Sequence, residues 1–181
     1  MPQWVIVVIA ILAITVIAEG AWIFFQNRRS VHLRGRFGPE YDRLVQERGS
    51  QRRAETALEK REKRVEKLHI RPLASRDRER FAAAWRVDQS RFVDDPKGAV
   101  TEADRLVAEV MEVRGYPISD FEQRVEDISV DHAQVVDNYR AATEIARRHE
   151  RGEATTEDLR RAMVYYRELF EDLLEIQEVR R

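Results

Sequence analysis

The chain of 181 residues contains no cysteine, and it has only seven glycines and five prolines. The absence of cysteine excludes disulfide bonds, thiolate metal ligands and a cysteine nucleophile, and it suits a reducing cytoplasm. Charged residues make up 36% of the sequence, and many charges with few glycines and prolines are typical of long, solvated helices. This composition predicts an all-α protein.

Motifs that carry catalysis or ligand binding are also missing. No glycine-rich nucleophile turn surrounds Ser129, and no HExxH metal motif occurs anywhere in the chain. The motifs typical of nucleic-acid-binding domains are absent as well, and the basic stretches are interleaved with acids that would repel phosphate. The sequence therefore predicts no catalytic residue, no metal, no cofactor and no nucleic-acid partner.

The net charge of −1 hides two halves of opposite sign. Residues 28–91 contain 19 basic and 10 acidic residues, whereas residues 92–181 contain 13 basic and 22 acidic residues. A basic residue close to an anionic lipid leaflet gains about 1 kcal/mol. The basic half therefore predicts a contact with membrane lipid.

The longest apolar run, residues 4–25, carries one charge, Glu19. Its 22 residues would make a helix of roughly 33 Å, enough to cross a hydrocarbon core of about 30 Å. Trp4 and Trp22 lie near its two ends, where aromatic rings favour the boundary between lipid and water. The run predicts a single transmembrane helix, with residues 1–28 as the anchor.

Arg28 and Arg29 follow the apolar run directly. Because basic residues beside a span tend to stay in the cytoplasm, we expect a single-pass protein of the inner membrane with its N-terminus outside and its C-terminal domain cytoplasmic. A cleaved signal peptide stays open, since Ala18-Glu19-Gly20 resembles a cleavage site, although the basic start of such peptides is missing. Glu19 would lie near the headgroups or contact a partner in the membrane.

Residues 29–71 are expected to form a basic connector and a long charged spacer helix. The helical pattern runs from Pro39 to Leu68 and is weakened at Gly49-Ser50. In a heptad frame over 39–68, five of eight a and d positions are apolar. This pattern gives weak support to a coiled coil and to a weak homo-oligomer, and both stay as alternatives.

Residues 72–181 show repeated helix signals and no strand signal of comparable strength. Asp95-Pro96, Ser119 with Glu122, and Thr155 with Asp158 are typical helix starts. This segment predicts an acidic bundle of about five helices. Its clearest apolar stripe consists of Leu159, Met163, Tyr166, Phe170 and Leu173.

Five segments of this bundle resemble an uncharacterised bacterial family. They are RFVDDP (91–96), VMEVRGYP (110–117), ISVDH (128–132), NYRAA (138–142) and TTEDLRRAM (155–163). Members of that family look like membrane-anchored or soluble helical proteins without an assigned activity. The resemblance implies a bacterial helical domain over the distal two thirds of the chain, and it transfers no catalytic residue, cofactor or substrate.

These features favour a non-enzymatic module, an adaptor or scaffold that binds another protein. Catalytic motifs are missing, whereas an anchor, a spacer and a capped bundle can all be recognised in the sequence. The candidate contact residues for the partner are Tyr116, Pro117, His132, Tyr139 and Arg140.

Two alternatives stay open. A metal-dependent or small-molecule-dependent enzyme would use Asp127, Asp131 and His132, because carboxylates and an imidazole can bind a metal or transfer protons. A self-associating structural protein would use the helix of residues 39–68.

Overall fold

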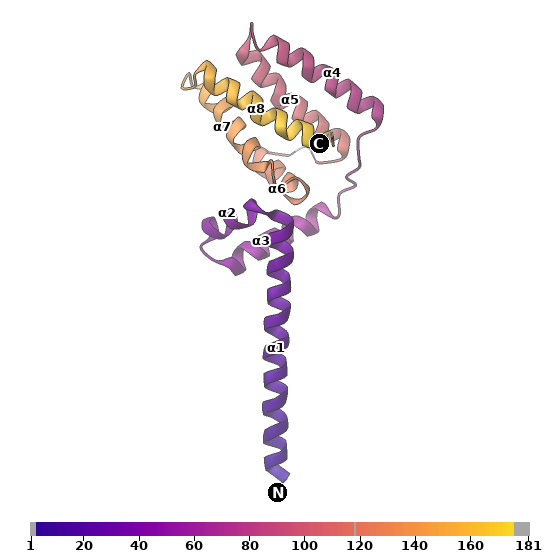
Figure 1. Ribbon diagram of the computed structural model, residues 1–181, viewed down its shortest axis with the longest axis vertical. Coiled ribbons are helices and arrows are strands. Elements are labelled where there is room, and N and C mark those ends of the chain that lie inside the picture. Colours follow the sequence, from indigo (N-terminus) through magenta and orange to yellow (C-terminus); the bar gives the residue numbers. More distant parts are fainter. Residues whose placement is uncertain (1–2, 118, 176–181) are drawn as a thin grey trace, which may run out of the picture.

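A computed structural model describes residues 3–117 and 119–175, and all regular secondary structure in these residues is helical. This confirms the all-α prediction. Figure 1 shows α1 projecting from a head in which α2 and α3 lie beside its C-terminal end and α4 to α8 lie beyond them. The eight helices of these residues are α1 (Gln3–Phe37), α2 (Pro39–Arg48), α3 (Gln51–Val65), α4 (Ser75–Arg91), α5 (Pro96–Arg114), α6 (Phe121–Asp131), α7 (Val136–Glu150) and α8 (Thr156–Leu173).

The prediction of a membrane anchor is contradicted. In the described part of the chain, no helix combines the length and the mean hydropathy that a bilayer crossing requires. The transmembrane helix in residues 1–28 and the single-pass inner-membrane location are therefore corrected. The side chains of Trp4 and Trp22, expected at the ends of the span, lie outside the described residues.

Among the described side chains of α1, those that are buried against the rest of the chain lie in its C-terminal turns. Leu33 and Phe37 are buried there, whereas Glu19 and Arg28 are exposed. Arg29 is half-buried and forms an ion pair with Glu59 at 2.6 Å. Seven large apolar side chains of α1 are 54–71% exposed, namely Leu12, Ile14, Val16, Ile17, Phe24, Phe25 and Val31.

Residues 39–68 form a helical hairpin and not the single spacer helix that was predicted. Gly49 adopts φ +62°, which ends α2 in the left-handed conformation that glycine tolerates best. Ser50 is extended, and α3 begins at Gln51. Leu44 and Leu58, which a coiled coil would present to a partner helix, are fully buried inside the chain.

The buried apolar side chains form two clusters that meet at α6. The larger cluster joins α4 to α8, and the smaller one joins the end of α1 to the hairpin. Helix α6 places Val125 and Ile128 in the larger cluster and Val130 in the smaller one. The predicted boundary between residues 29–71 and residues 72–181 falls in the connection between α3 and α4. Helix α6 packs against both sides of this boundary and so joins the hairpin to the bundle.

The helix starts of the bundle are capped largely as the sequence predicts. Asp95 accepts a hydrogen bond from the Gly98 amide at 2.8 Å, with Pro96 as the next residue. Thr155 and Asp158 form the expected capping box. The predicted box of Ser119 and Glu122 is wrong, because α6 begins at Phe121 and Asp120 caps it.

The interface of α4 and α8 contains a stacked aromatic pair. The ring centroids of Trp85 and Phe170 are 4.6 Å apart with 21° between the planes, and neither residue is more than 5% exposed.

We expect Phe170→Ala to lower the free energy of unfolding by about 3–5 kcal/mol, measured by chemical denaturation. Val93→Ala, at a side chain that is 83% exposed, should change it by less than about 0.5 kcal/mol. A loss below about 1 kcal/mol for Phe170→Ala would contradict this packing.

Asp88 of α4 is a buried carboxylate. It is 3% exposed, and neither of its oxygens has a hydrogen-bond partner among the described residues. Burial, assisted by the negative charge of Glu102, raises its pKa to about 6. Between about pH 4 and pH 6 the folded chain therefore holds a proton that the unfolded chain has lost, so the free energy of unfolding falls as the pH rises.

We expect Asp88→Asn to raise the free energy of unfolding at pH 7.5 by up to about 3 kcal/mol, because the amide carries no charge to desolvate. The variant should also lose the decline in stability between about pH 4 and pH 6. Urea denaturation over a pH series measures both effects. Asp94→Asn, at an exposed neighbour, is the matched control, and the same profile in wild type and Asp88→Asn would contradict the assignment.

Candidate functional site

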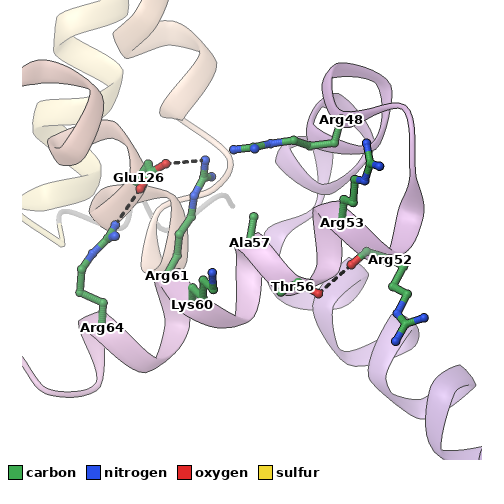
Figure 2. Close-up of a pocket in the computed structure, with 9 residues that line it drawn as sticks. All are labelled: Arg48, Arg52, Arg53, Thr56, Ala57, Lys60, Arg61, Arg64 and Glu126. Atoms are coloured by element: carbon green, nitrogen blue, oxygen red, sulfur yellow. Dashed lines mark hydrogen bonds and ion pairs between the residues drawn. The ribbon is translucent and has the colours of Figure 1, made fainter.

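A hollow of about 500 Å³ opens to solvent where the hairpin meets α6 (Figure 2). Its size lies within the roughly 300–1,000 Å³ of typical ligand pockets. We call this hollow the basic cleft. The residues that line it are Arg48, Arg52, Arg53, Thr56, Ala57, Lys60, Arg61, Arg64 and Glu126.

Helical spacing explains why one face of α3 supplies most of this lining. Arg53, Ala57, Arg61 and Arg64 recur every three or four residues, which places them on one side of the helix. Arg48 comes from the last turn of α2, and the turn at Gly49 brings it to the same hollow. The hairpin therefore assembles the cleft from two short, basic segments.

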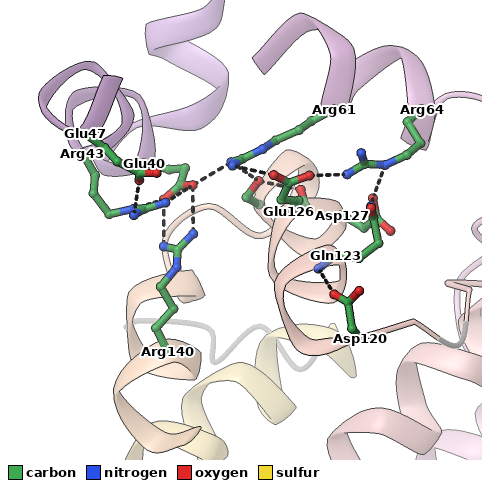
Figure 3. Close-up of polar contacts among 11 residues, drawn as sticks. Glu40, Arg43, Glu47, Arg61, Arg64, Asp120, Gln123, Glu126, Asp127 and Arg140 are labelled. Carbon is green, nitrogen blue, oxygen red and sulfur yellow. Dashed lines mark hydrogen bonds and ion pairs between the residues drawn. The ribbon is translucent and has the colours of Figure 1, made fainter. Parts of the chain in front are cut away.

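Two of the arginines in the cleft are held by carboxylates. Arg61 donates to Glu40 at 2.7 Å and to Glu126 at 3.2 Å. Arg64 donates to Asp127 at 2.7 Å and to Glu126 at 3.0 Å. These two guanidinium groups lie beside α6 (Figure 3), and we call the part of the hollow that they line the inner end of the basic cleft.

The other four basic side chains of the cleft are exposed and unpaired. Within residues 3–117 and 119–175, the charged groups of Arg48, Arg52, Arg53 and Lys60 take part in no ion pair. Like charges gathered on one helical face repel each other and create a positive potential. The four unpaired cations therefore give the cleft an excess of positive charge.

A buried carboxylate lies behind the cleft (Figure 3). Glu40, in the first turn of α2, is 1% exposed and accepts hydrogen bonds from Arg43, Arg61 and Arg140 at 2.7–3.0 Å. Burial acts to raise its pKa, but these three guanidinium groups outweigh burial and lower the pKa to about 2. Because Arg140 belongs to α7, this ion-pair network joins the hairpin to the bundle.

The residues that the sequence indicated as partner contacts are mostly buried. Tyr116, His132 and Tyr139 are 3%, 8% and 0% exposed, whereas Pro117 is exposed. Arg140 is half-buried and is held by Glu40. Binding of a partner by these residues stays a prediction. Tyr116, His132 and Tyr139 are buried in the fold, and Arg140 belongs to the ion-pair network.

The carboxylates and imidazole proposed for an enzyme are each engaged elsewhere. Asp127 pairs with Arg64, Asp131 with Arg36 at 3.1 Å, and His132 with Asp172 at 2.5 Å. Across the described ranges, no group of three or more His, Asp or Glu side chains is arranged to hold a metal ion.

Sequence reasoning missed the cleft because residues 39–68 were predicted to form one long charged spacer helix. The basic residues of α3 recur at helical spacing, and that signal is visible in the sequence. The contribution of Arg48, and the pairing of Arg61 and Arg64 with α6, depend on the hairpin and on contacts over more than 60 residues of sequence.

Comparisons with protein-family models, with curated proteins and with solved structures gave no match for this chain. The resemblance of its bundle segments to a bacterial family stays an expectation. Fold and site together define the class as an all-helical protein with an open basic cleft, and its function has to be inferred from that cleft.

We expect Glu40→Gln to lower the free energy of unfolding at pH 7 by about 3–5 kcal/mol, because three guanidinium groups lose their shared buried charge. In the wild type, the stabilisation by Glu40 should be lost as the pH falls from about 4.5 to 2, since the folded pKa lies below the unfolded one. Urea denaturation at both pH values measures these effects. Glu47→Gln removes the exposed Glu47–Arg43 pair and should cost less than about 1 kcal/mol; equal losses would contradict a special role for Glu40.

Proposed function

We propose that this protein is a helical protein-interaction module, an adaptor that binds an acidic segment of another protein in the basic cleft. The observation that carries the proposal is the set of four exposed, unpaired basic side chains around one hollow, Arg48, Arg52, Arg53 and Lys60. Guanidinium groups match carboxylates well, because their planar fork can donate two parallel hydrogen bonds. The inner end of the cleft already binds one carboxylate, that of Glu126.

The surroundings of the cleft favour a short acidic peptide over nucleic acid. Glu126 lines the cleft, and Asp127 lies directly behind Arg64. A nucleic-acid backbone needs a continuous basic track, and nearby carboxylates repel its phosphates. A peptide can instead place single carboxylates between the basic groups.

Binding by exposed charges is expected to be moderate in strength and sensitive to salt. Each exposed ion pair contributes roughly 0.2–1 kcal/mol, and its attraction is screened over about 10 Å at 0.1 M salt. Such contacts raise the rate of encounter and select partners by charge. This behaviour suits an adaptor that forms reversible complexes.

The two alternative functions have less support. The three residues proposed for catalysis each have a separate partner: Asp127 and Asp131 pair with Arg64 and Arg36, and His132 is hydrogen-bonded to Asp172. Self-association through residues 39–68 would need an apolar stripe, but Leu44 and Leu58 are buried within the chain. No specific observation favours either alternative over binding in the cleft.

We expect the full chain to bind fluorescein-labelled octaglutamate, measured by fluorescence anisotropy, and to bind octaglutamine much more weakly. Non-ionic detergent should be present, because α1 exposes apolar side chains. Raising the salt from about 50 to 300 mM should weaken binding. Arg52→Glu/Arg53→Glu should lower the affinity by about tenfold or more, because two attractive charges become repulsive.

The matched control is Arg76→Glu/Arg86→Glu, which makes the same charge change on exposed residues of α4. It should lower the affinity far less than the change in the cleft. Equal losses in the two variants would mean diffuse attraction and would contradict the proposed site. Tighter binding of a single-stranded DNA oligonucleotide, lost in Arg52→Glu/Arg53→Glu, would replace the protein partner by nucleic acid.

A further inference from the structure

Glu126 alone is acidic among the nine residues that line the basic cleft (Figure 2). It projects from α6 and contacts both Arg61 and Arg64, at 3.2 and 3.0 Å. Its side chain is 33% exposed, so it faces solvent as well as the two guanidinium groups. The inner end of the cleft is therefore already occupied by a carboxylate of the chain itself.

Each of the two arginines holds a second carboxylate that is more deeply buried than Glu126. Arg61 also binds Glu40, and Arg64 also binds Asp127, and both of these acids are 1% exposed. If Glu126 moved away, both guanidinium groups would keep their positions, because their buried partners remain. The contacts of Glu126 can thus be exchanged, whereas those of Glu40 and Asp127 are fixed.

We infer that Glu126 is an internal counter-ion, and that an acidic residue of the partner segment takes its place on Arg61 and Arg64. The inference rests on the proposed function and deepens it, because it identifies where the leading carboxylate of the ligand binds. Arg48, Arg52, Arg53 and Lys60 then contact the carboxylates that follow. Because the lining of the cleft is mainly basic, the ligand that we infer is an acidic peptide segment of a partner protein.

Displacement has two consequences for affinity. Glu126 competes with the ligand for the same guanidinium hydrogen bonds, and its charge repels the incoming carboxylate. By linkage, any change that weakens the contacts of Glu126 with α3 strengthens binding of the ligand. Because of this competition, only a partner segment with enough negative charge displaces Glu126 and occupies the cleft.

We expect Glu126→Gln to raise the affinity of the full chain for labelled octaglutamate by about five- to tenfold, measured by fluorescence anisotropy in non-ionic detergent. Glu47→Gln is the matched control, because it removes one negative charge from the same hairpin beside Arg48 but outside the lining of the cleft. Its affinity should change by less than about twofold. Equal gains in the two variants would overturn the inference.

A second variant separates displacement from simple charge repulsion. Glu126→Asp keeps the charge but is one methylene shorter, so it reaches Arg61 and Arg64 less well. Displacement predicts a higher affinity for octaglutamate in this variant, whereas repulsion by charge alone predicts no change. Thermal unfolding checks that both variants are folded. If Glu126→Gln does not fold, Glu126→Asp alone tests the inference.

The result also distinguishes this inference from the proposed function. If the wild type binds octaglutamate through Arg52 and Arg53 and neither Glu126 variant gains affinity, the internal counter-ion is refuted while the adaptor proposal stands. If no variant binds octaglutamate, both fail. If Glu126→Gln self-associates in sedimentation equilibrium and gains nothing for the peptide, the cleft accepts a second copy, and the inferred partner segment is overturned.

Discussion

The buried carboxylate of Glu40 is the interaction on which the arrangement of this protein depends. It receives guanidinium groups from its own helix, from α3 and from α7, so one charge joins both helices of the hairpin to a bundle helix that lies about 100 residues further along the chain. A buried charge is tolerated only when it is paired and hydrogen-bonded. Arg43 and Arg61 belong to the hairpin itself, so the contact of Glu40 with Arg140 of α7 is the one that fixes the hairpin against the bundle in this network.

This position of the hairpin creates the basic cleft. Glu40 pairs with Arg61 of α3, and Arg61 also contacts Glu126 of α6. In this arrangement the unpaired basic side chains of α3 line the cleft and face solvent. The apolar contacts of the hairpin, with Leu44 and Leu58 buried, stabilise this pose without specifying where the charges point. The basic cleft and the ion-pair network therefore share α3, and Glu126 lines the cleft while pairing with Arg61 of the network.

Local patterns predicted much of the bundle. The helix starts at Asp95 and Thr155 were correct because a cap needs only residues that are three positions apart. The predicted cap at Ser119 was wrong, since Asp120 offers the same hydrogen bond one residue later. The spacer helix was wrong because the helical pattern is similar in one long helix and in two helices broken at Gly49. The predicted membrane span is contradicted for the described residues.

The sequence by itself determined that the regular secondary structure of the described residues is helical, where α5 and α8 begin, and that the chain is basic in one half and acidic in the other. It could not reveal that Glu40 is buried, nor that Arg140 reaches it across 100 residues of sequence. Only the tertiary structure decided which basic residues of α3 are neutralised and which stay free. The reason is physical: secondary structure follows from neighbours along the chain, whereas the pairing of a charge depends on which distant carboxylate the fold brings within hydrogen-bonding distance.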